Sequence, residues 1–244
     1  MRLDNQVVII TGVSHAGQVG FALASAFARE GASLAICSRN TERVNARAQE
    51  LQAAGAKVLP IASDLTTEEG AQSLIQQTLA TYGKINILVN LAGGLTKYMP
   101  SDELSVADWD AELNNNLRST FLCTRAVWPV MKSQGGGKIL NFSRAGTVQS
   151  SSPKMLAYNC AKAGVDALTV TMAKEGKNFG IYVNAIGPGL VNTQSNIASM
   201  NPSTEELNKK WVSREVIAEA AIFLVSSASD GVNGVTLPIQ AKGI

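Results

Sequence analysis

The chain has 244 residues and a net charge of +2, and only 16% of its residues are charged against about 25% in an average soluble domain. With 45% hydrophobic residues it is not a disordered chain, yet no apolar run approaches the roughly 20 residues of a transmembrane helix, and the residues after Met1 do not resemble a signal peptide. One histidine and three scattered cysteines exclude the usual zinc sites, so we expect no metal and no disulfide framework, and we expect a reducing cytoplasm. The absence of a long basic run gives little support to nucleic-acid binding.

Short apolar runs alternate with helical segments along the whole chain. The predicted strands are 7–11, 33–37, 57–62, 85–90, 138–142, 181–186 and 234–239, and the predicted helices are 19–30, 41–54, 66–82, 105–132, 155–178 and 214–227. Helix 105–132 is expected to bend or end near Pro129. Several strands are apolar on both faces, as in a parallel sheet covered by helices on both sides. The alternation predicts one α/β domain with a doubly wound, seven-stranded parallel sheet. The stretch from 187 to about 202 is expected to be a long functional loop.

Three glycines follow the first strand, at Gly12, Gly17 and Gly20. A dinucleotide-binding turn needs glycine at its tight bend, where the backbone approaches the pyrophosphate, and where helix meets strand. The phosphates would then lie over the free N–H groups at the helix N-terminus. An ordinary turn between strand and helix is the alternative, and His15 faces a phosphate or is simply solvated.

The second strand ends in Ser38 and Arg39. An acidic residue at this point favours NAD because it accepts hydrogen bonds from the ribose hydroxyls. A guanidinium instead suits a 2′-phosphate by charge and by its forked geometry. We therefore expect NADP(H) rather than NAD(H), the alternative being a solvated arginine that opens the next helix.

Tyr158 and Lys162 are four residues apart in a predicted helix, which puts them on one face. A nearby ammonium stabilises the phenolate and lowers the pKa of the tyrosine. Such a tyrosine can act as a general acid or base near neutral pH. A surface pair without a catalytic role is the alternative.

Several motifs now stand in order along nearly the whole chain. They are Thr11-Gly12…Gly20, Asn90-Leu91-Ala92-Gly93, Asn116, Ser143, Tyr158-x-x-x-Lys162 and Gly187-Pro188-Gly189…Thr193. This set resembles the short-chain dehydrogenase/reductase family, and within it the 3-oxoacyl-carrier-protein reductase-like group. The resemblance implies a Rossmann fold and an NADP(H)-dependent oxidoreductase that transfers hydride between nicotinamide and a carbonyl or alcohol substrate. A catalytically weak or inactive NADP(H)-binding protein and an enoyl reductase are the alternatives.

The resemblance also implies roles for single residues. Tyr158 exchanges the proton with the substrate oxygen, Lys162 lowers the pKa of that tyrosine and holds the nicotinamide ribose, Asn116 supports a water-linked proton relay, and Ser143 binds the substrate oxygen. With the turn and Arg39 included, the expected cofactor-binding residues are Gly12, Ser14, His15, Gly17, Val19, Gly20, Ser38, Arg39, Asp64, Leu65, Asn90, Ala92, Gly93, Tyr158, Lys162, Pro188, Gly189, Val191 and Thr193.

The chain departs from the family pattern in three places. The glycine turn is two residues longer than usual, Leu91 replaces an asparagine, and the position of the catalytic serine is ambiguous. Counting from Gly146 selects Ser143, whereas counting from the strand start selects Arg144, which could bind an anionic substrate group. Three serines before Tyr158 are the reserve candidates: Ser150, Ser151 and Ser152.

Further expectations concern the surroundings of the site. A substrate lid is expected at about 188–213, and the three cysteines are expected to be packing residues. The resemblance implies that helices 105–132 and 155–178 assemble a homotetramer, with a dimer as the alternative.

Overall fold

The computed structural model describes residues 1–146 and 151–241. Within these ranges, seven strands form one parallel sheet in the order β3-β2-β1-β4-β5-β6-β7, which confirms the predicted Rossmann-type α/β fold. The strands are β1 (Val7–Thr11), β2 (Ser33–Ser38), β3 (Val58–Ala62), β4 (Ile87–Asn90), β5 (Gly137–Phe142), β6 (Ile181–Pro188) and β7 (Thr236–Ile239). The strand order reverses between β1 and β4, and in open α/β sheets ligands bind beyond the carboxyl ends of the strands at such a switch point.

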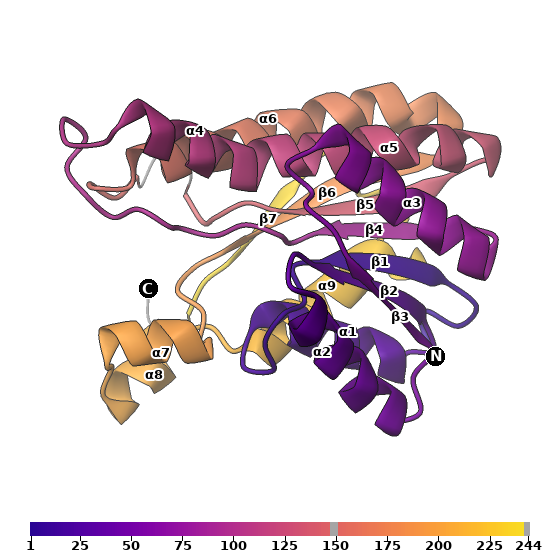
Figure 1. Ribbon diagram of the computed structural model, residues 1–244, viewed down its shortest axis with the longest axis horizontal. Coiled ribbons are helices and arrows are strands. Elements are labelled where there is room, and N and C mark those ends of the chain that lie inside the picture. Colours follow the sequence, from indigo (N-terminus) through magenta and orange to yellow (C-terminus); the bar gives the residue numbers. More distant parts are fainter. Residues whose placement is uncertain (147–150, 242–244) are drawn as a thin grey trace.

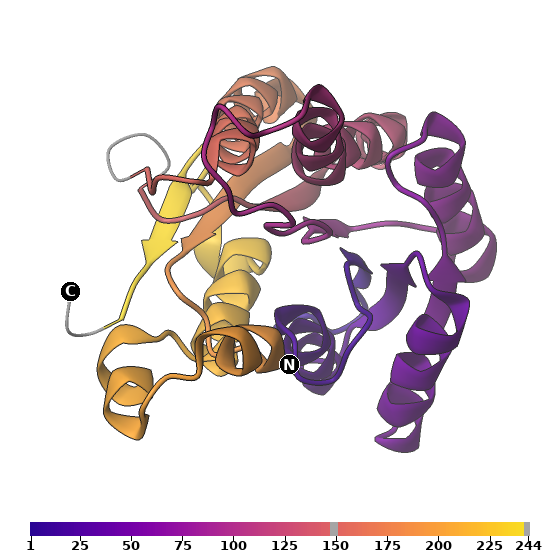
Figure 2. The same ribbon diagram turned by 60° about the vertical axis from the view of Figure 1, so that its left-hand side comes forward.

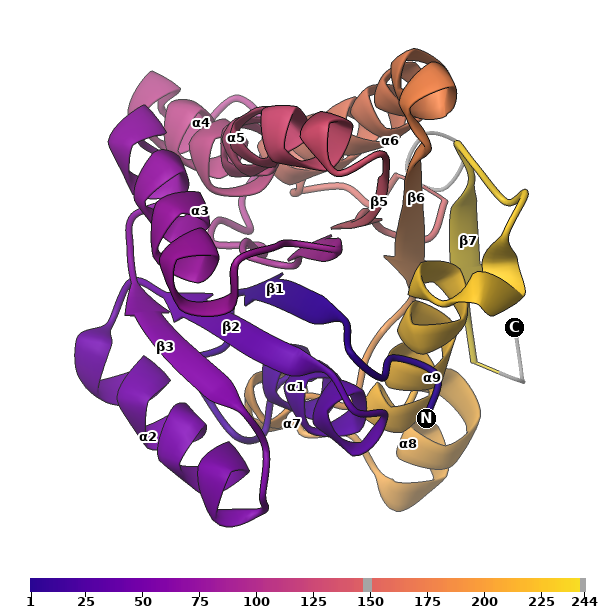
Figure 3. The ribbon, with the colours of Figure 1, turned by 90° about the vertical axis from the view of Figure 1, so that its right-hand side faces the viewer.

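Helices cover both faces of this sheet (Figures 1 and 3). On one face lie α1 (Val19–Arg29), α2 (Thr41–Ala53) and α9 (Arg214–Val225). On the other lie α3 (Glu68–Tyr82), α4 (Val106–Leu113), α5 (Ser119–Ser133) and α6 (Leu156–Gly176). None of the helices in the described ranges is long and apolar enough to cross a membrane.

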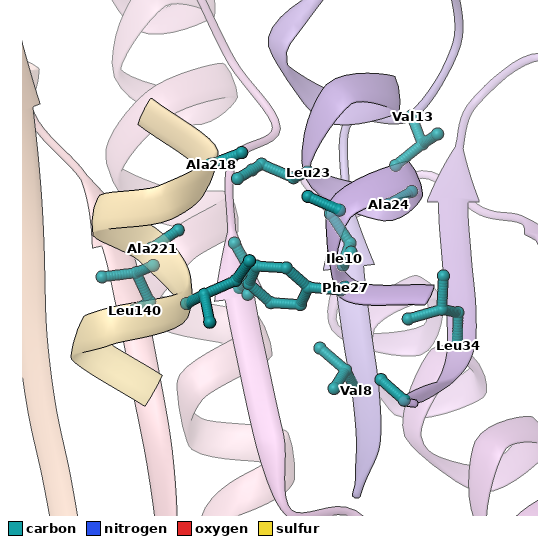
Figure 4. Packing of buried hydrophobic residues seen from close by; sticks show 14 of the residues in the cluster. Val8, Ile10, Val13, Leu23, Ala24, Phe27, Leu34, Leu140, Ala218 and Ala221 are labelled. Carbon is teal, nitrogen blue, oxygen red and sulfur yellow. The ribbon is translucent and has the colours of Figure 1, made fainter. Parts of the chain in front are cut away.

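The core divides into two apolar clusters, one on each face of the sheet. Figure 4 shows Phe27 of α1 packed among Val8 and Ile10 of β1 and Ala218 and Ala221 of α9. Phe27 is completely buried, and burial of a side chain of this kind contributes about 1.5–3 kcal/mol. The strands are therefore apolar on both faces because both faces carry helices.

The predicted helix over 105–132 is divided in the structure. The π-helix η1 (Asn114–Arg118) separates α4 from α5, and α5 continues through Pro129 to Ser133. Val127 and Met131 are buried against the sheet on either side of the proline. Their packing outweighs the hydrogen bond that the proline removes, so the helix does not end near Pro129, and the alternative of a bend there stays a prediction.

The sequence predicts a long irregular loop after β6, but the structure shows helices there. This stretch contains α7 (Gln194–Met200) and α8 (Thr204–Lys210), beyond the carboxyl ends of the strands and on the side of α1 and α9 (Figures 1 and 2). The Thr193 side chain caps α7, and Ser203 with Glu206 forms a capping box for α8. Two short 3-10 helices, η2 (Lys177–Phe179) and η3 (Ser227–Ser229), complete these elements.

Candidate active site

The candidate site lies at the carboxyl ends of the central strands, and Thr11 ties two of these ends together. Its buried hydroxyl donates to the carbonyl of Val89 at 3.2 Å and accepts from the backbone N–H groups of Leu91 at 3.0 Å and Ala92 at 2.9 Å. The end of β1 and the Asn90–Gly93 segment after β4 are thereby held in one place.

The glycine turn packs tightly between β1 and α1. A Cβ on Gly20 would lie 2.5 Å from the carbonyl oxygen of Gly12, so only glycine allows the helix to approach the turn this closely. The N-cap residue, Gln18, makes no side-chain capping bond, and the first turn of α1 carries no acidic residue. His15 is exposed on the turn. A helix start with these properties fits the phosphates of a dinucleotide.

The rim beside this turn carries Arg39 and Asp64. The exposed Arg39 guanidinium lies 3.5 Å from the side-chain oxygen of Asn115, and the Ser38 hydroxyl donates to the carbonyl of Asn40 at 3.0 Å. Hydrogen bonds from the backbone and hydroxyl of Thr66 lower the pKa of Asp64, and the charge of Arg39 lowers it further. With a cation and a hydroxyl at the end of β2, the donor set fits a ribose phosphate.

Asn90 is buried, and its side chain forms bonds within the protein. Its amide donates to Thr124 at 3.1 Å and to Asn141 at 3.0 Å, and Asn141 donates onward to Thr169 at 2.9 Å. This polar chain joins β4 and β5 to α5 and α6. A direct contact of Asn90 with a cofactor stays a prediction, as it does for Leu65, Ala92 and Gly93.

Asn116 lies in η1 and is completely buried. Its side-chain oxygen accepts from the backbone N–H of Gly94 at 2.9 Å, and its amide donates to the carbonyl of Gly94 at 3.1 Å and to the Glu112 carboxylate at 3.0 Å. A Cβ on Gly93 would lie 2.6 Å from the same Asn116 oxygen, which explains the glycine at that position. Glu112 is also completely buried, and nothing in the sequence had pointed to it.

Tyr158 and Lys162 face each other on α6 as the spacing predicts. The Lys162 nitrogen lies 5.6 Å from the centre of the Tyr158 ring and donates to the carbonyl of Phe142 at 2.7 Å. Burial lowers the pKa of Lys162 to about 8, against the opposing charges of Asp166 and Glu112.

The electrostatics of Tyr158 differ from the expectation. Burial raises the pKa of Tyr158 to about 12, the charge of Arg144 acts to lower this pKa, and the charge of Glu112 adds to the increase. The pKa of Tyr158 is therefore raised and not lowered as expected, because removal of the phenol from water is the largest effect and the cation that opposes it is Arg144 rather than Lys162. A phenol in this state is protonated at neutral pH and can act as a proton donor.

Ser143 and Arg144, the two candidates for the position of the catalytic serine, have different surroundings at the end of β5. Ser143 is buried, and its hydroxyl donates to the backbone carbonyl of Lys162 at 3.2 Å. Arg144 is partly buried and donates to the side-chain oxygen of Asn159 at 2.7 Å, beside Tyr158. Ser151 and Ser152 are exposed, and Ser150 lies outside the described residues. The substrate-binding role of Ser143 stays a prediction.

The segment after β6 is anchored to the turn and to neighbouring strands. Ala145 donates to Pro188 at 3.0 Å, Gly189 donates to Ile239 at 2.8 Å, and the backbone of Gln194 donates to Gly17 at 2.9 Å. The segment 188–194, which includes Val191 and Thr193, is therefore held beside the glycine turn.

Two of the three cysteines are packing residues, as expected. Cys37 and Cys123 are buried, and burial raises the pKa of the Cys37 thiol to about 12. Cys160 is exposed on α6, so the prediction that it is a packing residue does not hold within this chain.

Comparisons with known proteins agree with this arrangement. Residues 6–203 match the family described as short chain dehydrogenase. The chain is 36% identical to the D-threitol dehydrogenase of Mycolicibacterium smegmatis, over 98% of this chain and 93% of that protein. It is 32% identical to the 3-oxoacyl-[acyl-carrier-protein] reductase of Thermotoga maritima, over 98% of both. A solved structure of a 7α-hydroxysteroid dehydrogenase complexed with NADH and 7-oxo glycochenodeoxycholic acid matches with a TM-score of 0.89 at 30% identity, over 100% of this chain and 96% of that one.

Proposed function

Since the chain belongs to the short-chain dehydrogenase/reductase family, we propose that it is an NADP(H)-dependent oxidoreductase that interconverts a carbonyl compound and its alcohol. The observation that supports this most directly is the pair Tyr158 and Lys162 on one face of α6, with η1 and its Asn116 packed against the same helix. These groups supply proton transfer and charge balance without a histidine, a thiolate or a metal.

In the reductive direction, Tyr158 donates its phenolic proton to the substrate oxygen as negative charge develops there. The Lys162 ammonium stabilises the phenolate that results. Asn116 holds the backbone of Gly94 through two hydrogen bonds. A bound nicotinamide cofactor supplies or accepts the hydride.

The proposed cofactor preference depends on Arg39. The cation stands at the end of β2, where an acidic side chain would select NAD(H), so the charge favours a 2′-phosphate and NADP(H). The turn from Gly12 to Gly20 and the start of α1 would hold the phosphates. Asp64 would hold the adenine side, and the segment 188–193 would hold the nicotinamide amide.

The proposed substrate is a 3-oxoacyl-like carbonyl compound, with the segment 188–213 acting as a lid. The names of the relatives include a tetritol, an acyl-carrier-protein thioester and a steroid, so the family spans chemically distant alcohols. One observation favours a catalytically weak NADP(H)-binding protein as the second candidate, because the Ser143 hydroxyl is bonded to the Lys162 carbonyl.

Consumption of NADPH against a panel of ketones, 3-oxoacyl thioesters and sugars tests the proposal. Tyr158→Phe is expected to lower kcat at least a hundredfold, the smaller end of what proton transfer contributes, while the Kd for NADPH changes little. Retention of most activity in this variant contradicts the assigned proton donor. Binding of NADPH without turnover of any compound in the panel supports the second candidate.

We further propose that the chain is a homotetramer, with a dimer as the alternative. Support comes from apolar side chains exposed on α4, α5 and α6, among them Val106, Phe121 and Val170. Light scattering at several protein concentrations measures the mass, and a monomer of 25.7 kDa at all of them contradicts the proposal.

A further inference from the structure

Glu112 of α4 is a completely buried carboxylate that lies outside every motif considered above. One of its oxygens accepts from the backbone N–H of Thr96 at 2.5 Å, from the Thr96 hydroxyl at 2.7 Å and from the backbone N–H of Lys97 at 2.9 Å. The other accepts from the amide of Asn116 at 3.0 Å. The carboxylate therefore joins the 94–97 loop after β4 to a proposed member of the proton relay.

All four partners donate, which is the pattern of an ionised carboxylate, since the protonated acid would present a donor of its own. Removing such a charge from water costs several kcal/mol unless hydrogen bonds compensate. The four donors are neutral groups of the 94–97 loop and Asn116. They stabilise the buried charge without neutralising it.

Four hydrogen bonds determine which way the Asn116 amide points, and one of them is to the Glu112 carboxylate. The amide nitrogen donates to that carboxylate and to the backbone carbonyls of Glu112 and Gly94, so the oxygen is left to accept from the Gly94 N–H. With the side-chain oxygen and nitrogen exchanged, the oxygen would face the carboxylate and the nitrogen would face a backbone donor. Only one orientation of the amide satisfies both neighbours.

The same loop reaches the segment that leads into α6. Beyond Lys97, the backbone N–H of Met99 donates to the carbonyl of Lys154 at 3.0 Å, and the Lys154 nitrogen lies 5.8 Å from the centre of the Tyr98 ring. Lys97 is also paired with Asp108 of α4 at 3.0 Å. Glu112 thus binds Thr96 and Lys97, and the residues that follow them contact Lys154, four residues before Tyr158.

The charge of Glu112 acts on both proposed proton-transfer groups. It raises the pKa of Lys162 and the pKa of Tyr158. The other charges that act on this pair are Asp166, from α6 itself, and Arg144, which follows β5.

We propose that Glu112 is a positioning residue of the proton-transfer site. Its carboxylate adds to the hydrogen bonds that orient the Asn116 amide, holds the 94–97 loop in place and, together with Asp166, supplies the negative charge that acts on Lys162. The inference rests on the proposed function, because Lys162 and Tyr158 matter here as groups that manage a proton.

Glu112→Gln removes the charge and keeps the shape. Loss of a nearby negative charge lowers the pKa of both Lys162 and Tyr158, so the pH profile of kcat/KM is expected to move down by about one pH unit. Hydrogen bonds to a neutral amide oxygen are weaker than those to a carboxylate, so we expect the backbone N–H groups of Thr96 and Lys97 to exchange with deuterium at least about tenfold faster, the factor for 1.4 kcal/mol of lost protection.

Two further variants separate the charge from the contacts. Asp166→Asn removes a charge that acts on Lys162, from a carboxylate that accepts from the Thr236 hydroxyl of β7, so it is expected to shift the profile and to leave exchange at Thr96 and Lys97 unchanged. Thr96→Val removes only the hydroxyl bond to Glu112 and keeps the charge, so it is expected to speed exchange at Lys97 without a shift of the profile.

The inference is overturned if Glu112→Gln leaves either the pH profile or the exchange rates as in the wild type. If this variant does not fold, exchange in the wild-type protein decides: slow exchange at Thr96 and Lys97 supports the inference, and exchange as fast as in an unstructured peptide overturns it. Lack of turnover by the wild-type protein counts against the proposed function alone, since the exchange measurements need no substrate.

Discussion

The side-chain nitrogen of Lys162 donates a 2.7 Å hydrogen bond to the backbone carbonyl of Phe142, the last residue of β5. The buried ammonium of Lys162 therefore lies at the carboxyl end of β5. Burial at this place lowers the pKa of Lys162 to about 8. The lysine titrates close to neutral pH because the carboxylates Asp166 and Glu112 only partly offset the loss of water around it.

The first prediction concerns the alkaline side of the pH profile. The kcat/KM for carbonyl reduction reports groups of the free enzyme, so it should fall about tenfold per pH unit above about pH 8, where Lys162 loses its proton. Asp166→Asn removes a charge that raises the pKa of Lys162, so the decline should begin at lower pH. Steady-state rates between pH 6 and 10 measure both, and a rate that stays level to pH 10 contradicts the role of the ammonium.

Arg39→Asp tests the cofactor preference. Loss of a charged hydrogen bond costs about 1.5–3 kcal/mol, so the Kd for NADPH should rise about ten- to a hundredfold while NADH binding improves or stays unchanged. Arg43→Asp is the matched control, because it makes the same change of charge at an exposed position farther along α2. An unchanged ratio of NADPH to NADH affinity in Arg39→Asp removes the basis for NADP(H).

Arg144→Ala and Ser143→Ala compare the two residues at the end of β5. Because the charge of Arg144 lowers the pKa of Tyr158, its removal should make the phenolate harder to form and lower kcat about tenfold, with partial recovery in Arg144→Lys. Ser143→Ala should cost about 1 kcal/mol of unfolding free energy through the lost bond to Lys162 and affect kcat less. The opposite order of kcat values would show that the Ser143 hydroxyl turns to the substrate.

Gly20→Ala is informative because we expect it to lower the free energy of unfolding, whereas the same change in a helix normally raises it. Alanine in place of a helical glycine normally stabilises a protein by up to about 1 kcal/mol. Here the added Cβ would lie 2.5 Å from the Gly12 carbonyl, so we expect a loss of about 1–3 kcal/mol and weaker NADPH binding. Chemical denaturation and a binding titration measure these effects, with Ser25→Ala on the same helix as control. A variant more stable than the wild type would show that α1 does not approach the turn this closely.

The framework of the molecule was readable from the sequence because its signals are local. Each strand is a short apolar run next to a turn residue, and the four-residue spacing of Tyr158 and Lys162 predicts that they share one face of a helix. The π-helix over Asn114–Arg118 has no such local signal. α7 was missed because Gln194, Ser195 and Asn196 show no apolar period and only the cap at Thr193 indicates a helix start.

Glu112 shows most clearly what a single chain conceals. In the sequence it stands among Asp108, Trp109, Asp110 and Leu113, where a glutamate normally belongs to the solvated face of a helix. Its burial depends on donors 15 and 16 residues away that only the folded loop brings together. Likewise, the direction of the pKa shift of Tyr158 depends on burial, which four-residue spacing does not reveal.

The single bridge between Val191 and Val212 has a consequence for how this protein could change over time. The backbone N–H of Asn192 donates to Val212 at 2.9 Å, and that of Val212 donates to Leu190 at 2.8 Å, so the chain that carries α7 and α8 leaves and rejoins the framework at adjacent points. Because its two ends are hydrogen-bonded to each other, the segment between Val191 and Val212 can become longer or shorter, or differ between relatives, while the distance between its ends stays constant. Selection for activity on a new alcohol can therefore change this segment, while the sheet and the proposed proton-transfer groups are inherited unchanged.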